Sequence, residues 1–437
     1  MTAYGIEFLT EAGRYVNVDR NRTEEAVGWL LNTQQADGSW KPHYGDTTAG
    51  LNLYIAEVLA RTIARDDFSK SVSKDLHDRV NGAVKKALEW AATSATAVHD
   101  PYANALRLRL TNEATTAVQL HAELTQTAVH DRDGAHWTRA TYSPFYGWGH
   151  AGDLETTALV LRALGQSASL AVNRSLENDA LFYLLRNKDR YGIWFSGQAT
   201  VRILQALLPM AAEQMTAPRG FQEFRLAVNR TPLSGKDAEA LKADPRMLEP
   251  PRSLDLTALL KPGHSELDFS NASDTALASA EISVSFYSPW KQDVTNAQSS
   301  TQTGKDYGLD FGYKCEADGA KVGQPINCNV GVRRFGSSGY GMLLAEVGLP
   351  PGADVDRASL ARLLDNWTIS RYELQPDRIV FYLWSWKAEG SHLSFSFMPR
   401  YGIHAKTAPA TLSDYYNPDL KVALAPQTFT VLNQPRK

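Results

Sequence analysis

Apolar residues recur at helical spacing through the first half of the chain, up to about residue 216. They follow the i, i+3, i+4, i+7 pattern that places side chains on one face of an amphipathic helix. The groups are Ala26, Trp29 and Leu30; Leu51, Ile55, Val58 and Leu59; Leu76, Val80, Val84 and Leu88; Leu154, Ala158 and Leu161; and Val201, Leu204 and Leu208. Asn21, three residues before Glu24, is typical of a helix start. This half is therefore predicted to be helical, with each apolar group on one face of a helix.

Strand periodicity replaces helix periodicity from Phe224 onward. Apolar and polar residues alternate from Ile282 to Phe286 and again from Leu393 to Phe397, which is the pattern of a half-buried β-strand. The stretch 296–304 is rich in Ser, Thr and Gln and is predicted to be a linker. The expected fold is multidomain, α and then antiparallel β, with a helical region at 1–216, a β segment with its linker at 217–304, and a β-sandwich at 305–437.

A turn that carries Gly and a large aromatic residue is repeated in the helical half. It occurs as Asp37-Gly-Ser-Trp40, as 133–137 ending in Trp137, as Tyr191-Gly-Ile-Trp194, and more loosely as Tyr146-Gly-Trp148. A new apolar helix begins within several residues of most of these turns. The repeat predicts paired helices stacked around a ring, an α/α toroid, with each Trp wedged between helix ends. An irregular helical bundle with coincidental Trp turns is the alternative.

The composition excludes two classes of protein. The 437 residues include 45 Lys and Arg against 48 Asp and Glu, a net charge of −3, so the basic surface of a nucleic-acid binder is missing. No apolar run approaches the roughly 20 residues that cross a bilayer. Glu7 and Glu11 interrupt the apolar stretch near the N-terminus, and no basic segment precedes it, so no signal peptide is recognised.

The only two cysteines, Cys315 and Cys328, bracket a polar, Gly-containing loop between two short predicted strands. One interpretation is a pair of unrelated buried thiols. The other, which we favour, is a disulfide, and disulfides form in oxidising compartments. An extracellular or secreted location, periplasmic in a bacterium, is then expected. An exported chain without a signal peptide would be the C-terminal part of a longer secreted protein.

Segments at both ends of the chain carry a family resemblance. In the helical half they are 1–9, 15–19, 26–40, 181–188 and 191–208, and in the β half they are 340–354, 369–383, 393–397, 408–416 and 428–431. The first set resembles the thioester-containing domain of alpha-2-macroglobulins and complement components. The second set, with Asp414-Tyr-Tyr near its end, resembles the receptor-binding domain of macroglobulins. Between them, 224–290 lies where that family places the returning half of a CUB β-domain.

The resemblance lacks the chemistry of its family. A Cys-Gly-Glu-Gln motif forms the family's thioester, and this sequence contains no such motif and no cysteine in the helical half. The resemblance starts downstream of that motif. The toroid is therefore expected to be incomplete, with uncovered apolar helix faces, and the missing macroglobulin domains are expected upstream.

Two further sites are implied by the resemblance. Some complement-type members place a histidine behind the Asp-Gly-aromatic turn, where it takes over the acyl group. His43, close behind Trp40, is the candidate, and a solvated loop histidine is the simpler interpretation. Vertebrate macroglobulins present two lysines on the receptor helix, and Arg357 and Ala361 occupy those positions here, with Arg362 beside the second. Because Arg does not replace Lys and the other position is apolar, ordinary helix charges are favoured over a receptor site.

The resemblance implies a protease inhibitor. In that family a protease cuts a bait segment, and the attacker is held by a conformational change or by acylation. We expect this chain to be the C-terminal portion of such an endopeptidase inhibitor, acting on proteases through the full-length protein. No enzyme activity, cofactor, metal, nucleic acid or membrane insertion is expected. The alternatives are a toroid enzyme, such as a polysaccharide lyase or a terpene cyclase, and a plain extracellular adhesion or scaffold module.

Overall fold

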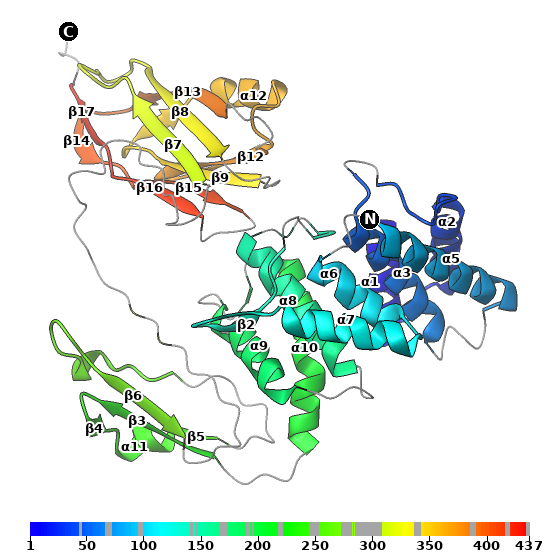
Figure 1. Ribbon diagram of the computed structural model, residues 1–437. Helices are drawn as coiled ribbons and strands as arrows, with labels where there is room; N and C mark the ends of the chain where they lie inside the picture. The colour runs from blue at the N-terminus through cyan, green and yellow to red at the C-terminus, as the bar shows by residue number, and fades with distance from the viewer. Residues whose placement is uncertain are drawn as a thin grey trace.

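The structure is a computed structural model of the chain. It describes residues 1–42, 46–65, 72–94, 99–139, 143–145, 147, 149–166, 173–188, 193–194, 196–216, 222–243, 253–271, 282, 284, 308–335, 342–384, 390–415 and 420–433. Two separate hydrophobic cores form in these ranges, one from helices in the first half and one from strands in the last third. The expected order of α and then antiparallel β is confirmed (Figure 1).

The helical region has two layers. Its helices are α1 (Thr2–Ala12), α2 (Arg20–Thr33), α3 (Ala49–Ala64), α5 (Lys74–Thr93), α6 (Pro101–Leu110), α7 (Ala114–Gln126), α8 (Gly149–Gln166), α9 (Arg174–Arg186) and α10 (Gly197–Thr216), with a hairpin of β1 (Val129–Asp131) and β2 (Gly134–His136). Helices α3, α6 and α8 are buried on nearly all sides, whereas α5, α7 and α9 bury one face. The inner helices pack in the order α1, α3, α6, α8, α10. This is the predicted α/α toroid.

The turns that end in Trp40, Trp137 and Trp194 each join an outer helix to the inner helix that follows, with the same pattern of hydrogen bonds. Tyr146 and Trp148 of the looser fourth turn lie outside the described residues. The indole nitrogens of Trp40, Trp137 and Trp194 donate to the carbonyls of Leu30, Leu124 and Leu184, at 2.8, 2.7 and 2.6 Å. The backbone nitrogens of the same residues donate to side chains of the next inner helix, on Asn52, Thr157 and Thr200. The predicted wedge is therefore a repeated bonding unit.

Glycine is required in two of these turns. Gly38 and Gly134 have positive φ values of 92° and 129°. A Cβ on Gly38 would lie 2.5 Å from the carbonyl oxygen of Lys86, and one on Gly134 would lie 2.3 Å from that of Asp179. Both turns therefore press their backbone against the next outer helix, α5 or α9, which only glycine permits.

The middle region forms a small sheet. It contains β3 (Gln222–Val228), β4 (Thr231–Pro232), α11 (Gly235–Glu239), β5 (Lys242–Ala243), a 3-10 turn (Thr257–Leu259) and β6 (Leu267–Asn271). Strands β3 and β6 pair antiparallel, with Phe224 stacked on Phe269 and Phe269 itself 41% exposed. The strand expected at 282–286 lies largely outside the described residues, and Ile282 and Val284 are exposed with no strand assigned. The linker expected at 296–304 also lies outside them.

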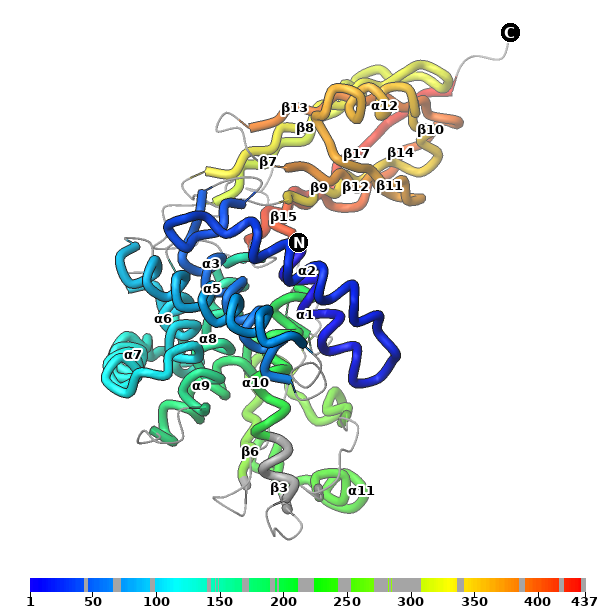
Figure 2. The backbone as a smooth tube through the Cα atoms, turned by 90° about the vertical axis from the view of Figure 1, so that its right-hand side faces the viewer, coloured from blue at the N-terminus to red at the C-terminus, as the bar shows by residue number. Residues whose placement is uncertain are grey.

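The last third is a two-sheet sandwich (Figure 2). One sheet has the order β10 (Ala353–Val355), β13 (Ser391–Pro399), β8 (Ile326–Phe335), β7 (Gly308–Cys315); the other has β11 (Arg371–Gln375), β12 (Arg378–Trp384), β9 (Met342–Gly348), β15 (Ala410–Asp414), β16 (Lys421–Leu424). Strands β14 (Ile403–Lys406) and β17 (Thr428–Val431) pair separately, and α12 (Arg357–Asp365) packs on β13. The predicted strand 393–397 lies in β13, with Leu393, Phe395 and Phe397 buried and Ser394 exposed. Phe395 meets Phe381 of the opposite sheet, with ring centroids 5.8 Å apart.

One helix prediction was wrong in detail. The helix expected to start at Asn21 is capped by Asp19, whose side chain accepts from the Asn21 nitrogen. On α10, the predicted apolar face is exposed, as expected for an incomplete toroid: Val201, Leu204 and Leu208 are 44%, 42% and 63% accessible. The buried side of α10 carries Ala199, Ile203 and Ala206 instead. The reason is that α10 is the last described helix of the ring, so nothing in the described residues packs on its far side.

Candidate functional site: the axis of the helical region

Charged and aromatic side chains meet where the inner helices face one another. The guanidinium of Arg202 on α10 forms a bidentate ion pair with Glu7 on α1, with Nη1–Oε1 and Nη2–Oε2 distances of 2.7 and 2.9 Å. The hydroxyl of Tyr54 on α3 donates to Glu7 Oε2 at 2.7 Å. All three side chains are buried. Burial opposes ionisation of Glu7, but the hydrogen bonds and charge of Arg202, with Tyr54 and Arg61, hold the pKa of Glu7 below its usual range.

A second carboxyl group in the axis has a different environment. Glu155 of α8 is 2% exposed. Its carboxyl accepts from the Ser143 hydroxyl at 2.6 Å and faces the Tyr102 hydroxyl at 3.5 Å. Burial is the largest influence on Glu155, and it raises the pKa of this carboxyl above the usual value despite the nearby hydroxyls and arginines.

Two further ion pairs lie near the axis. Arg139 donates to Asp100 at 2.8 Å and lies over the Tyr102 ring, 4.5 Å from its centroid. Arg109 of α6 binds Glu57 of α3 at 2.6 Å. Ion pairs of this kind close the interior of the ring and fix the inner helices relative to one another.

Among the described residues of the axis, the hydroxyl and carboxyl groups that could react with a substrate are buried. Ser143, Glu155 and Tyr102 are all buried. A cavity of about 220 Å³ lies between α1 and α3, but the arginines that line it are engaged: Arg14 and Arg61 pair with Glu11, and Arg65 donates to the carbonyl of Thr10. In the described ranges, no three His, Cys, Asp or Glu side chains come close enough to hold a metal ion.

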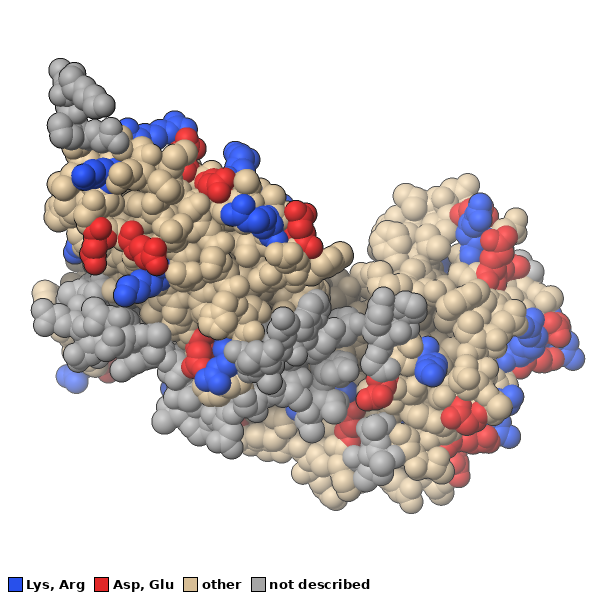
Figure 3. All heavy atoms as spheres, turned by 90° about the horizontal axis from the view of Figure 1, so that it is seen from above, with Lys and Arg blue, Asp and Glu red and all other residues tan. Residues whose placement is uncertain are grey.

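Acidic and basic side chains are interspersed over the face shown in Figure 3. Of the helices that the structure describes, none is long and apolar enough to cross a membrane.

Of the site residues proposed from the sequence, the structure describes the three positions on α12 and the two cysteines. His43 lies outside the described residues. Arg357, Ala361 and Arg362 are exposed side by side on α12, and the nitrogen of Ala358 binds the capping Asp356. None of the three α12 residues contributes to the axis of the helical region.

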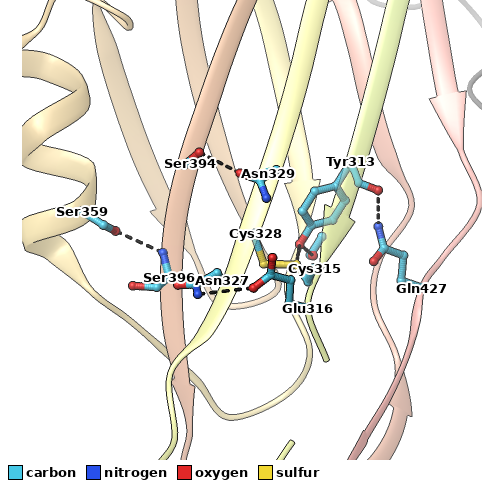
Figure 4. The surroundings of a disulfide bond; sticks show 11 residues. Tyr313, Cys315, Glu316, Asn327, Cys328, Asn329, Ser359, Ser394, Ser396 and Gln427 are labelled. Atoms are coloured by element: carbon cyan, nitrogen blue, oxygen red, sulfur yellow. Dashed lines mark hydrogen bonds between the residues drawn. A yellow bond between two sulfur atoms is a disulfide. The ribbon is translucent and has the colours of Figure 1, made fainter. Parts of the chain in front are cut away.

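The two cysteines form a disulfide (Figure 4). They are directly opposite each other on the neighbouring strands β7 and β8, and both side chains point into the sandwich. The Tyr313 hydroxyl lies 3.3 Å from Cys315 Sγ and donates to the carbonyl of Gly348 at 3.0 Å. The bond closes the hairpin end of one sheet.

Sequence reasoning missed the axis itself. Glu7 was noted only because it interrupts an apolar stretch, and Arg202 and Glu155 were not singled out. A usable signal was present, because each is a charged residue among the buried apolar residues of an inner helix. Such residues are rarely buried without a partner. The sequence could not show which charge meets which.

Comparison with known proteins agrees with this architecture. The A-macroglobulin TED domain matches residues 1–209, and the A-macroglobulin receptor binding domain matches residues 338–424. A search of the curated proteins found no significant match. The chain therefore belongs to the alpha-2-macroglobulin and complement family and corresponds to a C-terminal region of it.

Solved structures of bacterial macroglobulins share the fold. One is native Escherichia coli alpha-2-macroglobulin spanning domain MG7 to the C-terminus, with TM-score 0.55, 16% identity, and coverage of 98% of this chain and 62% of that chain. Another is Salmonella alpha-2-macroglobulin reacted with methylamine, with TM-score 0.54, 18% identity, and coverage of 98% of this chain and 25% of that one. This chain thus spans less than two thirds of either relative.

Proposed function

We propose that the chain is the C-terminal portion of a macroglobulin-type endopeptidase inhibitor, which holds proteases through a conformational change of the full-length protein. The order of the two matched domains supports this function. So does the likeness to solved macroglobulins, which covers nearly the whole chain. The chain itself is proposed to have no enzyme activity.

The observation that carries the proposal is the open side of the helical ring. Helix α1 packs on α2 and α3, and α10 packs on α8. Between α10 and α1 the ring is bridged inside by the Arg202–Glu7 ion pair. Outside, α10 exposes Val201, Leu204 and Leu208. A stripe of large apolar side chains on one helix face is expected to be covered in the working protein, and helices from upstream macroglobulin sequence are the proposed cover.

Each region then has a role in the larger protein. Residues 1–216 would supply part of the thioester-type domain without its Cys-Gly-Glu-Gln motif. Residues 217–304 would complete a CUB-like β-domain, since the described β3–β6 pair leaves Phe269 exposed. Residues 305–437 would be the terminal receptor-binding-type sandwich. The disulfide supports a secreted or periplasmic location.

Two proposed sites depend on the longer protein. His43 would accept an acyl group only from a thioester supplied by upstream sequence. The exposed Arg357 and Arg362 on α12 are ordinary helix charges in this proposal, because a receptor site built on paired lysines would lack one of its cations at Ala361.

The test compares the chain with a longer version that includes the sequence encoded upstream. The chain alone is expected to leave protease activity unchanged and to bind a hydrophobic dye. Replacing Leu204 and Leu208 with Ser should reduce dye binding, whereas Val118→Ser, at a lone exposed apolar residue of α7, should not. The longer chain should inhibit cleavage of a large protein substrate while a small peptide is still cut. Stoichiometric inhibition by the short chain, or none by the longer one, would overturn the proposal.

A further inference from the structure

Four arginines, one from each of four inner helices, lie close together in the helical region. They are Arg61 of α3, Arg109 of α6, Arg162 of α8 and Arg202 of α10. The side-chain oxygen of Gln205 accepts from Nη1 of Arg162 at 3.0 Å and from Nη1 of Arg202 at 3.2 Å. The charges of Arg61 and Arg109 also act on Arg162. These four residues form an arginine cluster, in which the like charges repel one another.

Three members of the arginine cluster each bind a glutamate. The nearest N–O distances are 2.7 Å for Arg202 and Glu7, 2.9 Å for Arg61 and Glu11, and 2.6 Å for Arg109 and Glu57. Each carboxylate neutralises the arginine to which it is bound. The cluster therefore holds four cations and three anions, and one positive charge is left over.

Arg162 is the member that has no carboxylate. Among the described residues, its guanidinium forms no ion pair, and its hydrogen bond goes to the neutral amide of Gln205. Burial, followed by the repulsion of Arg109, lowers the pKa of Arg162 to about 10, although Glu57 acts in the opposite direction. Helix α8 ends at Gln166, and a helix C-terminus supplies only a partial negative charge. A partly buried cation in this position is stabilised by an added anion.

The cluster is also short of hydrogen-bond acceptors. One oxygen of Gln205 serves both Arg162 and Arg202, and in the described part of the chain Nε of Arg202 is buried without a partner. Arg162 is half-buried, and none of its nitrogens is both buried and unpartnered. Its remaining N–H groups therefore touch solvent. Gly165 and Gln166, at the end of the same helix, are exposed, so a small acceptor can approach Arg162 from solution.

We propose that Arg162 binds the carboxylate of a ligand, either a free organic acid or an acidic side chain, near the C-terminal end of α8. With Nη1 bound to Gln205, the parallel Nε–H and Nη2–H groups remain, and they match the two oxygens of one carboxylate. A fourth carboxylate balances the four arginines of the cluster. The site does not depend on the proposed inhibitor function.

Thermal unfolding in acetate tests the site, since acetate carries the group that both kinds of ligand share. The helical circular dichroism signal is followed at pH 7 in sodium acetate and in sodium chloride of equal ionic strength. With a dissociation constant on the order of 10 mM, about 100 mM acetate should raise the midpoint by roughly 3 °C over chloride. A blocked peptide with one Glu that acts at lower concentration assigns the ligand to an acidic segment, and equal action assigns it to an organic acid.

Three variants locate the effect. Arg162→Gln should abolish the rise, because it removes the guanidinium. Arg162→Lys keeps the charge but not the planar fork, and should keep a smaller rise. Arg107→Gln is the matched control: Arg107 of α6 is also half-buried and donates to a neutral amide, that of Asn104 at 3.2 Å, but it lies outside the cluster. This control should keep the full rise.

A nuclear magnetic resonance signal reports binding even where a variant is less stable. In the wild type labelled with ¹⁵N-arginine, the Nε–H signal of Arg162 is identified by its loss in Arg162→Lys. It should shift as acetate is added, whereas the signal of Arg107 should not. An unshifted Arg162 signal, or an equal rise in midpoint for the wild type and Arg162→Gln, would overturn the proposal.

Discussion

The Trp turns show how single residues determine the pairing of helices. An indole offers one N–H donor on a large apolar ring, so a buried Trp needs an acceptor within reach. The carbonyls near the end of an outer helix lack helical partners. Trp40, Trp137 and Trp194 each use such a carbonyl. The turn is therefore a connector with a built-in hydrogen bond, which explains its repetition.

Removing one indole donor tests this connector. Trp137→Phe keeps most of the ring but leaves the buried Leu124 carbonyl without its indole donor, and is expected to destabilise the helical region by about 1–3 kcal/mol. Trp29→Phe, at the exposed Trp of α2, should change stability by less than about 0.5 kcal/mol. Denaturant unfolding followed by the helical circular dichroism signal measures both. Equal effects would contradict the role given to the turn.

Strand β8 places two consecutive arginines, Arg333 and Arg334, on opposite faces of its sheet. Side chains alternate across a strand, so Arg333 faces solvent and Arg334 faces the core of the sandwich. Arg333 pairs with Asp310 on the exposed face of β7. Arg334 pairs with the fully buried Asp414 at the end of β15, in the opposite sheet. Arg333 therefore forms an ion pair on the surface of one sheet, whereas the next residue, Arg334, links the two sheets through a buried ion pair.

These two ion pairs are predicted to differ strongly in their effect on stability. Asp414→Asn leaves Arg334 buried without its carboxylate, and should destabilise the sandwich by about 3–5 kcal/mol. Asp310→Asn removes the exposed pair, and should have an effect below about 1 kcal/mol. Calorimetric unfolding with the disulfide intact compares the variants. If both have the same small effect, the Arg334–Asp414 pair does not hold the sheets together.

On the scale of the whole molecule, the ends of the helical region are fastened through its axis. Glu7 and Arg202 are 195 residues apart in sequence, and their pair connects the first and last described helices of the ring. The apolar stripe of α10 lies outside this bridge. An ion pair thus links α1 and α10 inside the helical region. The outer face of α10 exposes apolar side chains, which is the arrangement expected where another segment packs.

The bridge is predicted to make the helical region sensitive to acid. Because the folded state lowers the pKa of Glu7, its stabilisation is present above the ordinary Glu pKa of about 4.3 and is lost as pH falls through the folded-state value. At neutral pH, Glu7→Gln should lower the stability of the helical region by about 3–5 kcal/mol. The difference from wild type should shrink toward pH 3. Glu25→Gln, at an exposed acid of α2, is the control and should behave as wild type throughout.

Periodicity predicted the class of each region because it depends only on local geometry. The groups around Leu154 and Leu393 are buried as expected. Val201, Leu204 and Leu208 also share one face of α10, but this face is exposed, since periodicity shows that residues share a face and not whether another element covers it. The helix start at Asn21 was wrong because Asp19 offers the same kind of capping oxygen two residues earlier.

The sequence by itself determined the order of α and β regions, the Trp turns, the disulfide partners and the family resemblance. All of these depend on spacing along the chain or on the presence of only two cysteines. The tertiary structure alone decided that Glu7 meets Arg202, that Arg334 meets Asp414, and that Ser143 binds Glu155. Each of these pairs joins separate elements, and the energy of a buried charge depends on its exclusion from water and on the partner that packing brings to it.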